Sequence, residues 1–207
     1  MINFLKKDLE DLIKTNYSVS KIDQAQEKIK LTFENKETHE FDYLIISEGV
    51  FSKSRNLVSN KQVLPKYNNT LAIRGTIPAN SNIIDKKNIL LFLGSDFHHV
   101  IYPISPGGDL NLIAIMKYKL SADEQKNYSL FNDKLFIQKI LKDIPQENKE
   151  FFYNLKELKI FPVFVSDSFF EVKNKNIHLI GDAFFAFPPS FAQGASQSIE
   201  GAHELYA

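Results

Sequence analysis

The sequence predicts a mixed α/β fold in which a mostly antiparallel sheet is inserted into an α/β domain. Two apolar, strand-like runs each end in a turn that pairs an acid with a glycine, at Glu48-Gly49 and at Gly181-Asp182. Between these turns, short apolar segments recur at regular spacing and are separated by turn residues, a pattern typical of antiparallel strands. We therefore expect residues 1–60 and 155–207 to form one domain and residues 61–154 a second one.

Composition limits the classes of protein to consider. The chain has 207 residues, 43% of them hydrophobic, with 18 Phe, no Cys and a formal net charge of zero. The lack of Cys excludes disulfides, thiolate nucleophiles and Cys-ligated metals, and zero net charge gives no overall basic field for nucleic acid. No apolar run approaches the roughly 20 residues that span a bilayer, and the charged N-terminus lacks the apolar core of a signal peptide. We expect a cytoplasmic protein without a membrane span.

The first domain is expected to begin with an amphipathic helix over residues 4–13, where apolar residues recur at helical spacing. Residues 16–22 favour a short strand. Residues 28–34 alternate apolar and polar side chains, as in a half-buried strand, and residues 35–40 are its turn. The nearly continuous apolar run 41–47 predicts a strand that is buried on both faces.

The second domain is expected to hold four short strands separated by clusters of turn residues. Their ranges are 70–78, 89–94, 98–104 and 110–119. The turn formed by residues 106–109 contains Pro, two Gly and Asp, and it predicts that the last two strands form a hairpin.

Two helices and an extended segment follow these strands. Ser121 to Glu124 has the pattern of a capped helix start. The run 130–141 has helical spacing that predicts a shared apolar face; this face would include Leu130, Leu135, Phe136, Ile140 and Leu141. Residues 155–165 are predicted to be extended and to return the chain to the first domain.

The segment that follows residue 177 has the chemistry of a nucleotide site. Gly181 lets the backbone approach a ligand closely, and the carboxylate of Asp182, at the end of a strand, can accept ribose hydroxyl protons. Small side chains at residues 194–198 predict a helix whose first N–H groups and positive dipole end are open to a ligand. The turn at Glu48-Gly49, followed by a helical turn near Arg55, repeats the pattern. Two such turns suggest one ligand region at the carboxyl edge of a sheet.

The two segments resemble the two internal signatures of FAD-dependent monooxygenases of the aromatic-ring hydroxylase group, in its salicylate-hydroxylase-like branch. The first is similar to that family's Asp-Gly-x-x-Ser-x-x-Arg element, through Gly49, Ser52 and Arg55, with Glu48 where the family has Asp. The second is similar to the Gly-Asp-Ala…Pro…Gly-Gln-Gly-Ala-Asn element. Its matching residues are Gly181, Asp182, Ala183, Pro188, Gln193, Gly194 and Ala195.

The resemblance implies a flavoprotein-hydroxylase fold, FAD as cofactor and NAD(P)H as co-substrate of a monooxygenase that hydroxylates a small aromatic or conjugated ring compound. In this family Asp182 would bind sugar or ribitol hydroxyls. The N-terminus of the helix at Gly194, Ala195 and Ser196 would point to the flavin. The other implied cofactor contacts are Glu48, Gly49, Arg55, Gly181, Ala183 and Pro188. The protein supplies no covalent catalyst in this chemistry, so no catalytic residue is assigned.

Candidate substrate residues are aromatic, with one cation. The aromatic ones, which could line a cavity or belong to the core, are Phe184, Phe185, Phe187 and Phe191. Arg74 is a charge on an apolar strand, and it could bind a substrate carboxylate or point to solvent. His98 and His99 are adjacent in a strand, so their side chains point to opposite faces and cannot chelate one metal. No metal site is predicted.

The family's Gly-x-Gly-x-x-Gly turn, which holds the FAD pyrophosphate, has no counterpart among the chain's 8 glycines. We therefore expect a fragment truncated at both ends, or a product that has lost its ADP-binding half, and not a catalytically competent chain on its own. Two alternatives stay open. One is a degenerate, non-catalytic binding domain derived from the family, and the other is a related FAD-dependent reductase or halogenase.

Overall fold

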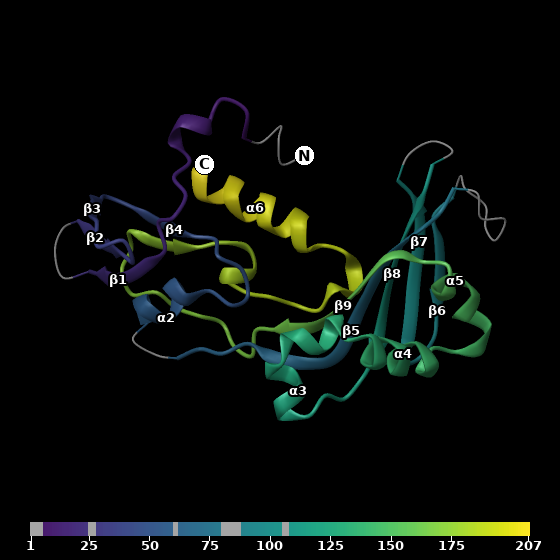
Figure 1. Cartoon of the computed structure of the whole chain (residues 1–207). Helices are drawn as coiled ribbons and strands as arrows, with labels where there is room; N and C mark the ends of the chain where they lie inside the picture. Colours follow the sequence, from purple (N-terminus) through teal and green to yellow (C-terminus); the bar gives the residue numbers. More distant parts are fainter. Residues whose placement is uncertain (1–5, 25–27, 60–61, 80–87, 105–107) are drawn as a thin grey trace. The chain divides into compact units, whose positions relative to one another are not determined.

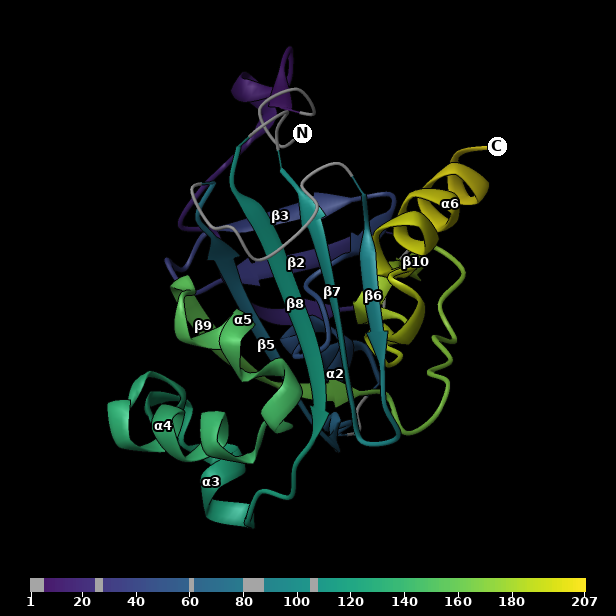
Figure 2. The ribbon, with the colours of Figure 1, turned by 90° about the vertical axis from the view of Figure 1, so that its right-hand side faces the viewer.

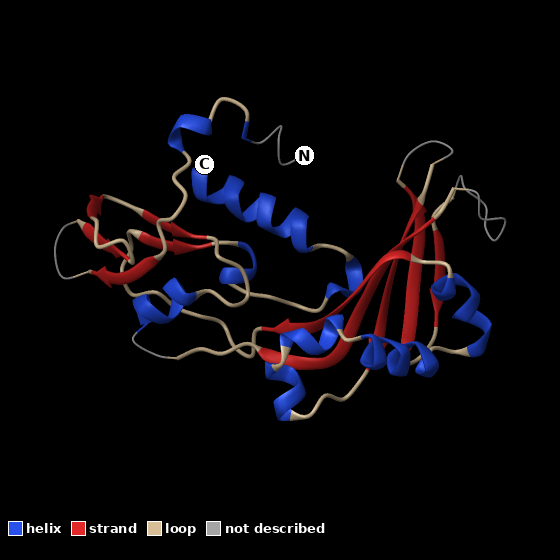
Figure 3. Cartoon of the chain, viewed as in Figure 1, coloured by secondary structure: helices blue, strands red, loops and turns tan. Residues whose placement is uncertain are grey.

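The computed structural model describes residues 6–24, 28–59, 62–79, 88–104 and 108–207. The chain divides into two compact units, each with its own apolar core. Unit 1 comprises residues 1–66 and 165–207, and unit 2 comprises residues 67–164. Figure 1 follows the chain through both units, and Figure 3 shows that each contains helices and strands.

Unit 1 contains an antiparallel sheet of three strands in the order β1-β2-β3. The strands are β1 (Val19–Asp23), β2 (Ile29–Phe33) and β3 (Thr38–Phe41). The alternation predicted over residues 28–34 is confirmed, because every second residue of β2 is buried. The turn after β2 is shorter than predicted, since β3 already begins at Thr38.

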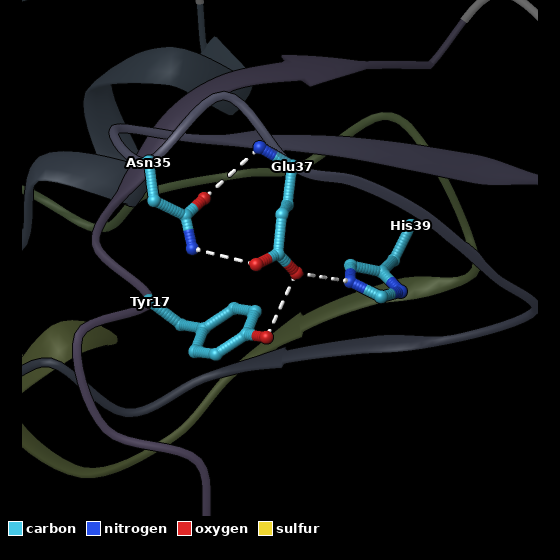
Figure 4. Close-up of polar contacts among 4 residues, drawn as sticks. All are labelled: Tyr17, Asn35, Glu37 and His39. Carbon is cyan, nitrogen blue, oxygen red and sulfur yellow. Dashed lines mark hydrogen bonds and ion pairs between the residues drawn. The ribbon is translucent and has the colours of Figure 1, made fainter.

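The turn between β2 and β3 is held by a polar cluster on the surface (Figure 4). Glu37 Oε2 accepts a hydrogen bond from the Tyr17 hydroxyl at 2.8 Å and lies 3.2 Å from His39 Nε2. Asn35 closes the turn, because its Oδ1 accepts the Glu37 N–H at 3.0 Å. The hydrogen bond from Tyr17, followed by the one from His39, lowers the pKa of Glu37. The polar groups of this cluster hydrogen-bond to one another, so the cluster is accounted for by its role in holding the turn.

A second, parallel pair of strands completes the sheets of unit 1. These strands are β4 (Leu44–Ile46) and β10 (Ile177–Leu179), which lie far apart in the sequence. The prediction of one doubly buried strand over residues 41–47 is wrong. The run is divided between β3 and β4, Ile45 is 52% exposed, and only Ile46 is buried. A continuous apolar run does not distinguish one strand from the end of one and the start of another.

The amphipathic helix predicted for residues 4–13 does not extend through that range. Of its described residues only Lys6 is α-helical, and residues 4 and 5 lie outside the described residues. A 3₁₀ turn over Glu10–Leu12 follows. Asp8 has a φ of +68°, a left-handed conformation that cannot continue an α-helix. Leu12 is 76% exposed, so helical spacing alone did not provide a surface to pack against.

Two α-helices of unit 1 lie wholly within the described residues, α2 (Lys53–Ser59) and α6 (Gly194–Tyr206). The helical turn predicted near Arg55 is confirmed by α2. Short 3₁₀ turns at Gly181–Ala183 and Pro189–Phe191 lie between β10 and α6.

Unit 2 is built on a sheet of five strands in the order β6-β7-β8-β5-β9 (Figure 2). They are β5 (Lys66–Ile77), β6 (Leu90–Leu93), β7 (Phe97–Pro103), β8 (Leu110–Lys117) and β9 (Lys156–Val165). β7 pairs antiparallel with β8, which confirms the predicted hairpin; residues 105–107 of its turn lie outside the described residues. All four strands predicted between residues 70 and 119 are present.

The segment 155–165 is extended as predicted, and the chain re-enters unit 1 at its last residue, Val165, but the segment up to Phe164 belongs to unit 2. It forms β9, which lies beside β5 at the edge of the sheet. Unit 2 therefore extends to Phe164, beyond the boundary expected at residue 155. An extended run does not reveal its partner strand, which is why the sequence placed it in the wrong unit.

Three short helices follow β8: α3 (Ala122–Lys126), α4 (Lys134–Asp143) and α5 (Lys149–Tyr153). The predicted capped start is confirmed, because Ser121 and Glu124 form a reciprocal capping box at the start of α3. The predicted apolar face of α4 needs one correction. Leu135 is 75% exposed, whereas Phe136 and Ile140 are buried. Leu135 lies about 100° around the helix from Phe136, on the side that faces solvent.

The core of unit 2 lies between one face of the sheet and these helices, and one polar side chain lies inside it. His99 is fully buried. Its ring stacks on Phe92 with centroids 4.3 Å apart, and three further phenylalanine rings surround it. Neither ring nitrogen has a hydrogen-bond partner in the described part of the chain. Aromatic contacts therefore hold the ring, while its one donor and one acceptor nitrogen stay unsatisfied when it is neutral.

Candidate functional site

The two signatures lie side by side at one edge of the parallel pair in unit 1. Ile177 pairs with Leu44 and Leu179 with Ile46, and the N–H of Ile180 donates to the Ile46 carbonyl at 3.1 Å. Parallel strands present their carboxyl ends at the same edge. The turns at residues 48–49 and 181–182 therefore leave the sheet together, as the sequence pattern predicted.

Glu48 holds the start of α2. Its Oε2 accepts hydrogen bonds from the Ser52 hydroxyl at 2.7 Å and the Ser54 N–H at 2.9 Å, and its Oε1 accepts from the Ser54 hydroxyl at 2.7 Å. Partial burial acts to raise the pKa of Glu48, but these hydrogen bonds together outweigh burial and lower the pKa below its usual value. Both carboxylate oxygens are thus engaged with the protein.

Arg55 joins the two signatures. The side chain is only 2% exposed. Nη1 donates to the Ala183 carbonyl at 3.1 Å, and Nη2 donates to the Val50 carbonyl at 2.8 Å. Burial lowers the pKa of the guanidinium. The sequence makes Arg55 a candidate nucleotide contact. In the structure its two terminal nitrogens donate to backbone oxygens of both turns, whereas its buried Nε has no partner among the described residues.

Gly181 allows α6 to lie close to the second signature. Its φ is +57°, a left-handed conformation that side chains disfavour, and a Cβ built there would lie 2.8 Å from Ser198 Oγ on α6. Gly49, in the first signature, has a φ of +81° but no atom within 4 Å of such a Cβ. The left-handed conformation favours glycine at both positions. At Gly181 a side chain would in addition displace the Ser198 hydroxyl.

Replacing Gly181 with alanine should destabilise unit 1 by roughly 1–3 kcal/mol, because the change adds a left-handed side chain and a contact with Ser198. Gly49→Ala should cost about 1 kcal/mol. Gly194→Ala, where a Cβ would meet nothing and φ is ordinary, is the matched control and should be neutral or stabilising. Urea unfolding of the three variants gives the order; a Gly181 variant as stable as the Gly194 variant would contradict the close contact.

A cleft of about 550 Å³ lies between the second signature and α6, entirely within unit 1. The Gly181–Phe187 segment forms one wall, and the side of α6 that begins at Gly194 forms the other. Its polar residues are Asp182, Gln197, Ser198, Glu200 and Glu204, and its aromatic ones are Phe169, Phe184, Phe185 and Phe187. The cleft thus combines acceptors, an aromatic wall and a helix N-terminus.

The charge of the cleft indicates which groups it can bind. Three carboxylates line it, from Asp182, Glu200 and Glu204, and no Lys or Arg among the described residues does. Phosphates would be repelled there, whereas hydroxyl groups can donate hydrogen bonds to the carboxylates. Phe169 stacks on Phe185, with ring centroids 4.6 Å apart and planes 23° apart, and provides a flat apolar surface. A ligand with hydroxyls and a planar ring fits this lining.

The predicted site residues of the second signature fall into two groups. Those that line the cleft are Gly181, Asp182, Phe185, Phe187 and Gly194. Ala195 and Ser196 lie in the first turn of α6, where they are exposed, and Pro188 is exposed before the 3₁₀ turn. Ala183 is fully buried and supplies the carbonyl that Arg55 holds.

The substrate candidate Arg74 lies in unit 2, exposed on β5. The sequence did not indicate Phe169, Glu200 or Glu204, which line the cleft with the predicted residues. Gly194, Ser198 and Gly201 share one face of the helix, and this face could have indicated the two glutamates, because it shows which side of the helix lies toward the turn at Gly181. No signal in the sequence pointed to Phe169.

Neither a metal centre nor a membrane-spanning helix is evident in the described part of the chain. The described residues include no group of three or more His, Asp or Glu placed to hold a metal ion. None of the described helices has the length and apolar character needed to cross a bilayer.

The chain is similar to several known proteins, although no family model matches it. It is 26% identical over 197 residues to the FAD-dependent monooxygenase pigN of Monascus ruber, covering 86% of this chain and 44% of that one. A salicylate hydroxylase in complex with its substrate superposes with a TM-score of 0.79 at 21% identity, over 99% of this chain and 54% of the other. HpxO of Klebsiella pneumoniae, in complex with FAD and uric acid, gives 0.64 at 15% identity, over 95% and 51%. The chain spans about half the length of these proteins.

Proposed function

We propose that this chain, which by sequence and fold is a relative of the FAD-dependent monooxygenases, forms part of an FAD site in a ring hydroxylase. The resemblance predicted from the two signatures and the flavoprotein-hydroxylase fold are both confirmed. The observation that carries the proposal is the cleft, in which Asp182 and the N-terminus of α6 face one volume. FAD matches this lining, because it carries hydroxyl groups for the carboxylates and a planar ring for the aromatic wall.

Asp182 is the central binding residue of the proposal. Its carboxylate is exposed and has no hydrogen-bond or ion-pair partner among the described residues, although it lies in a cleft. The ribityl or ribose hydroxyls of FAD would donate to it. The acidic lining favours this hydroxyl-bearing part of the cofactor over its pyrophosphate.

The first turn of α6 would bind the flavin ring. The first N–H groups of a helix have no partner within it, and Gln193 gives no side-chain cap. Gly194, Ala195 and Ser196 offer these donors without large side chains. The free N–H groups and the dipole of this 13-residue helix favour negative charge at its N-terminus. The edge of the flavin ring presents oxygen and nitrogen acceptors to such donors, in both its oxidised and its reduced form.

Glu48 and Arg55 would act as positioning residues in the same site. The first fixes α2 at the first signature, and the second fixes the Ala183 carbonyl at the second. When bound, the flavin supplies the redox chemistry, with NAD(P)H as electron donor and O2 as oxidant. The proposed substrate is a small aromatic or conjugated ring compound.

Replacing Asp182 with alanine should weaken FAD binding by about 1–3 kcal/mol, because the cofactor's hydroxyls lose their acceptor while buried. Titration of the chain into FAD, followed by flavin fluorescence, measures the change. Asp42→Ala, at an exposed ion pair with Lys28, is the control and should leave affinity unchanged. Riboflavin should compete for the same cleft, and ADP should not, because the lining is acidic.

Two outcomes would count against the proposal. Equal FAD affinity of the Asp182 variant and the parent chain would remove Asp182 from the site. A parent chain that binds neither FAD nor riboflavin would favour the non-catalytic alternative, in which the cleft is inherited from flavoenzymes without their cofactor.

A further inference from the structure

We propose that β6, the strand at one edge of the five-stranded sheet of unit 2, pairs with the β6 strand of a second copy of this chain. The two strands run antiparallel about a two-fold axis at Leu91, so that the sheets of the two copies join into one. The surface lies in unit 2, away from the cleft of unit 1, and the inference does not depend on the proposed function.

β6 is an edge strand (Figure 2). It pairs with β7 on one side, and no described strand pairs with it on the other. An edge strand directs some of its N–H and C=O groups away from the sheet, which makes it a template for a further strand. Folded proteins usually protect such an edge with charged side chains, proline or irregular backbone. The composition of β6 therefore indicates whether its edge is protected.

The two edges of this sheet differ in these protective features. β9, at the opposite edge, carries Lys156, Lys159 and Pro162, and Glu157 interrupts its extended backbone with a φ of +52°. β6 has none of these features, because it consists of three leucines and one phenylalanine. The sheet is thus protected against further pairing at β9 and open to it at β6.

The exposed side chains at β6 are aliphatic and share one face of the sheet. Ile89, just before the strand, Leu91 and Leu93 are 57% to 77% exposed. Side chains alternate along a strand, and Leu90 and Phe92 pack against the core of unit 2. The three exposed residues therefore project from the face opposite the core. Burial of these side chains against another strand would stabilise the pairing.

A two-fold axis perpendicular to the sheet is the symmetry that pairs two identical antiparallel strands. With the axis at Leu91, this residue lies opposite its own copy, and Ile89 lies opposite Leu93 of the second copy. Directly paired residues project from the same face. All exposed aliphatic side chains of both strands then form one row, in which each lies opposite another aliphatic group.

The charge of the strand favours a second copy as the occupant. A two-fold axis brings like charges together, so a strand that pairs with itself has to be uncharged near the axis. Residues 89–93 contain no charged side chain, whereas self-pairing of β9 would bring its lysines together. The contact comprises far fewer than the roughly 20–30 residues on each side of a stable interface. We therefore expect a weak dimer that forms as the protein concentration rises.

Leu91→Lys tests the pairing, because it places two ammonium groups against each other at the axis. Sedimentation velocity of the whole chain at increasing concentration should show a monomer and a dimer for the parent. The dissociation constant of the variant should be at least about tenfold higher. Leu135→Lys, at an exposed leucine of α4, is the matched control and should keep the parent's behaviour.

Cross-linking tests the register, and cysteine variants suit it because the chain contains no Cys. Directly paired residues of antiparallel strands have Cα atoms about 4.5–5.5 Å apart, a distance that a disulfide can span. Leu91→Cys should therefore give a disulfide-linked dimer on oxidation. Leu93→Cys, on the same strand and face, is the control, because its two copies lie roughly 14 Å apart and should cross-link much more slowly.

Three outcomes would overturn the proposal. The first is a parent chain that stays monomeric at every concentration. The second is a dimer that Leu91→Lys weakens no more than Leu135→Lys does, and the third is equal cross-linking of the two cysteine variants; both would place the contact on another surface. If Leu91→Lys does not fold, the two cysteine variants decide the question. Neither measurement involves FAD, so failure of the chain to bind FAD would refute the proposed function only.

Discussion

Replacing Arg55 with methionine should destabilise unit 1 locally by about 2–4 kcal/mol. The guanidinium is 2% exposed and donates to the carbonyls of Val50 and Ala183. Methionine fills much of the volume but leaves two carbonyls without donors, and hydrogen bonds from a charged group contribute about 1.5–3 kcal/mol each. Removing a charge that burial disfavours offsets part of this loss, which sets the upper limit.

Hydrogen exchange measured by mass spectrometry resolves this effect by segment. Exchange should accelerate in peptides covering both residues 44–59 and residues 177–185, because the side chain joins the two signatures. Arg55→Lys should be nearly as damaging, since one ammonium cannot donate to both carbonyls in the geometry of a planar fork.

Arg74→Met, the same change at the chain's other arginine, is the matched control. Arg74 is exposed, so its replacement should shift stability by less than about 0.5 kcal/mol. Unchanged exchange around Ala183 in the Arg55 variant would show that the two turns are held together by strand pairing alone.

Much of the fold was predictable because the local pattern and the tertiary environment agree. β2 alternates in the sequence, and its alternate residues are buried. Ser121 and Glu124 have the spacing of a capping box and form one. The strands of unit 2 were bounded by turn residues on both sides, which fixed their position within a few residues.

The errors occurred where partners decide the structure. Residues 4–13 have helical spacing, but spacing does not provide a packing surface, and Asp8 adopts a left-handed conformation. The apolar run 41–47 gave no sign of the break between β3 and β4. Residues 155–165 were recognised as extended, but only the pairing of β9 shows which sheet receives them.

The site was predictable as a pair of turns and not as a cleft. The acid-glycine pattern placed Gly181 and Asp182 correctly, because backbone conformation and strand ends leave a local signal. Contacts between distant parts of the chain left no signal in the sequence. Arg55 had the position of a ligand contact, but it donates to the carbonyl of Ala183, 128 positions away, and to that of Val50.

Replacing His99 with phenylalanine should remove an acid sensitivity of unit 2. Burial, followed by the nearby charge of His98, lowers the pKa of His99 to about 4, against an ordinary value of 6.5. Protonation is therefore easier in the unfolded chain than in the folded one. Above pH 6.5 the ring is neutral in both states, so His99 adds no pH dependence to the stability there. As pH falls from there toward 4 the unfolded state binds a proton that the folded state excludes, and stability is lost; below 4 both states are protonated and the loss levels off.

The size of this effect follows from the two pKa values. A difference of one pKa unit corresponds to about 1.4 kcal/mol, so the loss between pH 6.5 and pH 4 is at most roughly 3 kcal/mol. Phenylalanine places a ring among Phe92, Phe97, Phe151 and Phe152 without a titrating group. We therefore expect the variant to be increasingly more stable than the parent chain as pH falls through this window.

The comparison between variant and parent isolates His99 from the carboxylates that also titrate at acid pH, because both chains share them. Urea unfolding at a series of pH values gives the difference in free energy of unfolding, and His203→Gln, an exposed change on α6 in unit 1, is the control that should keep the parent's profile. A difference that does not vary with pH would mean that the folded state accommodates the imidazolium, which requires the ring to leave the phenylalanine cluster or to gain an acceptor. In that case the stacked arrangement would describe the neutral form alone, and an acid-induced rearrangement of β7 would replace the simple loss of stability.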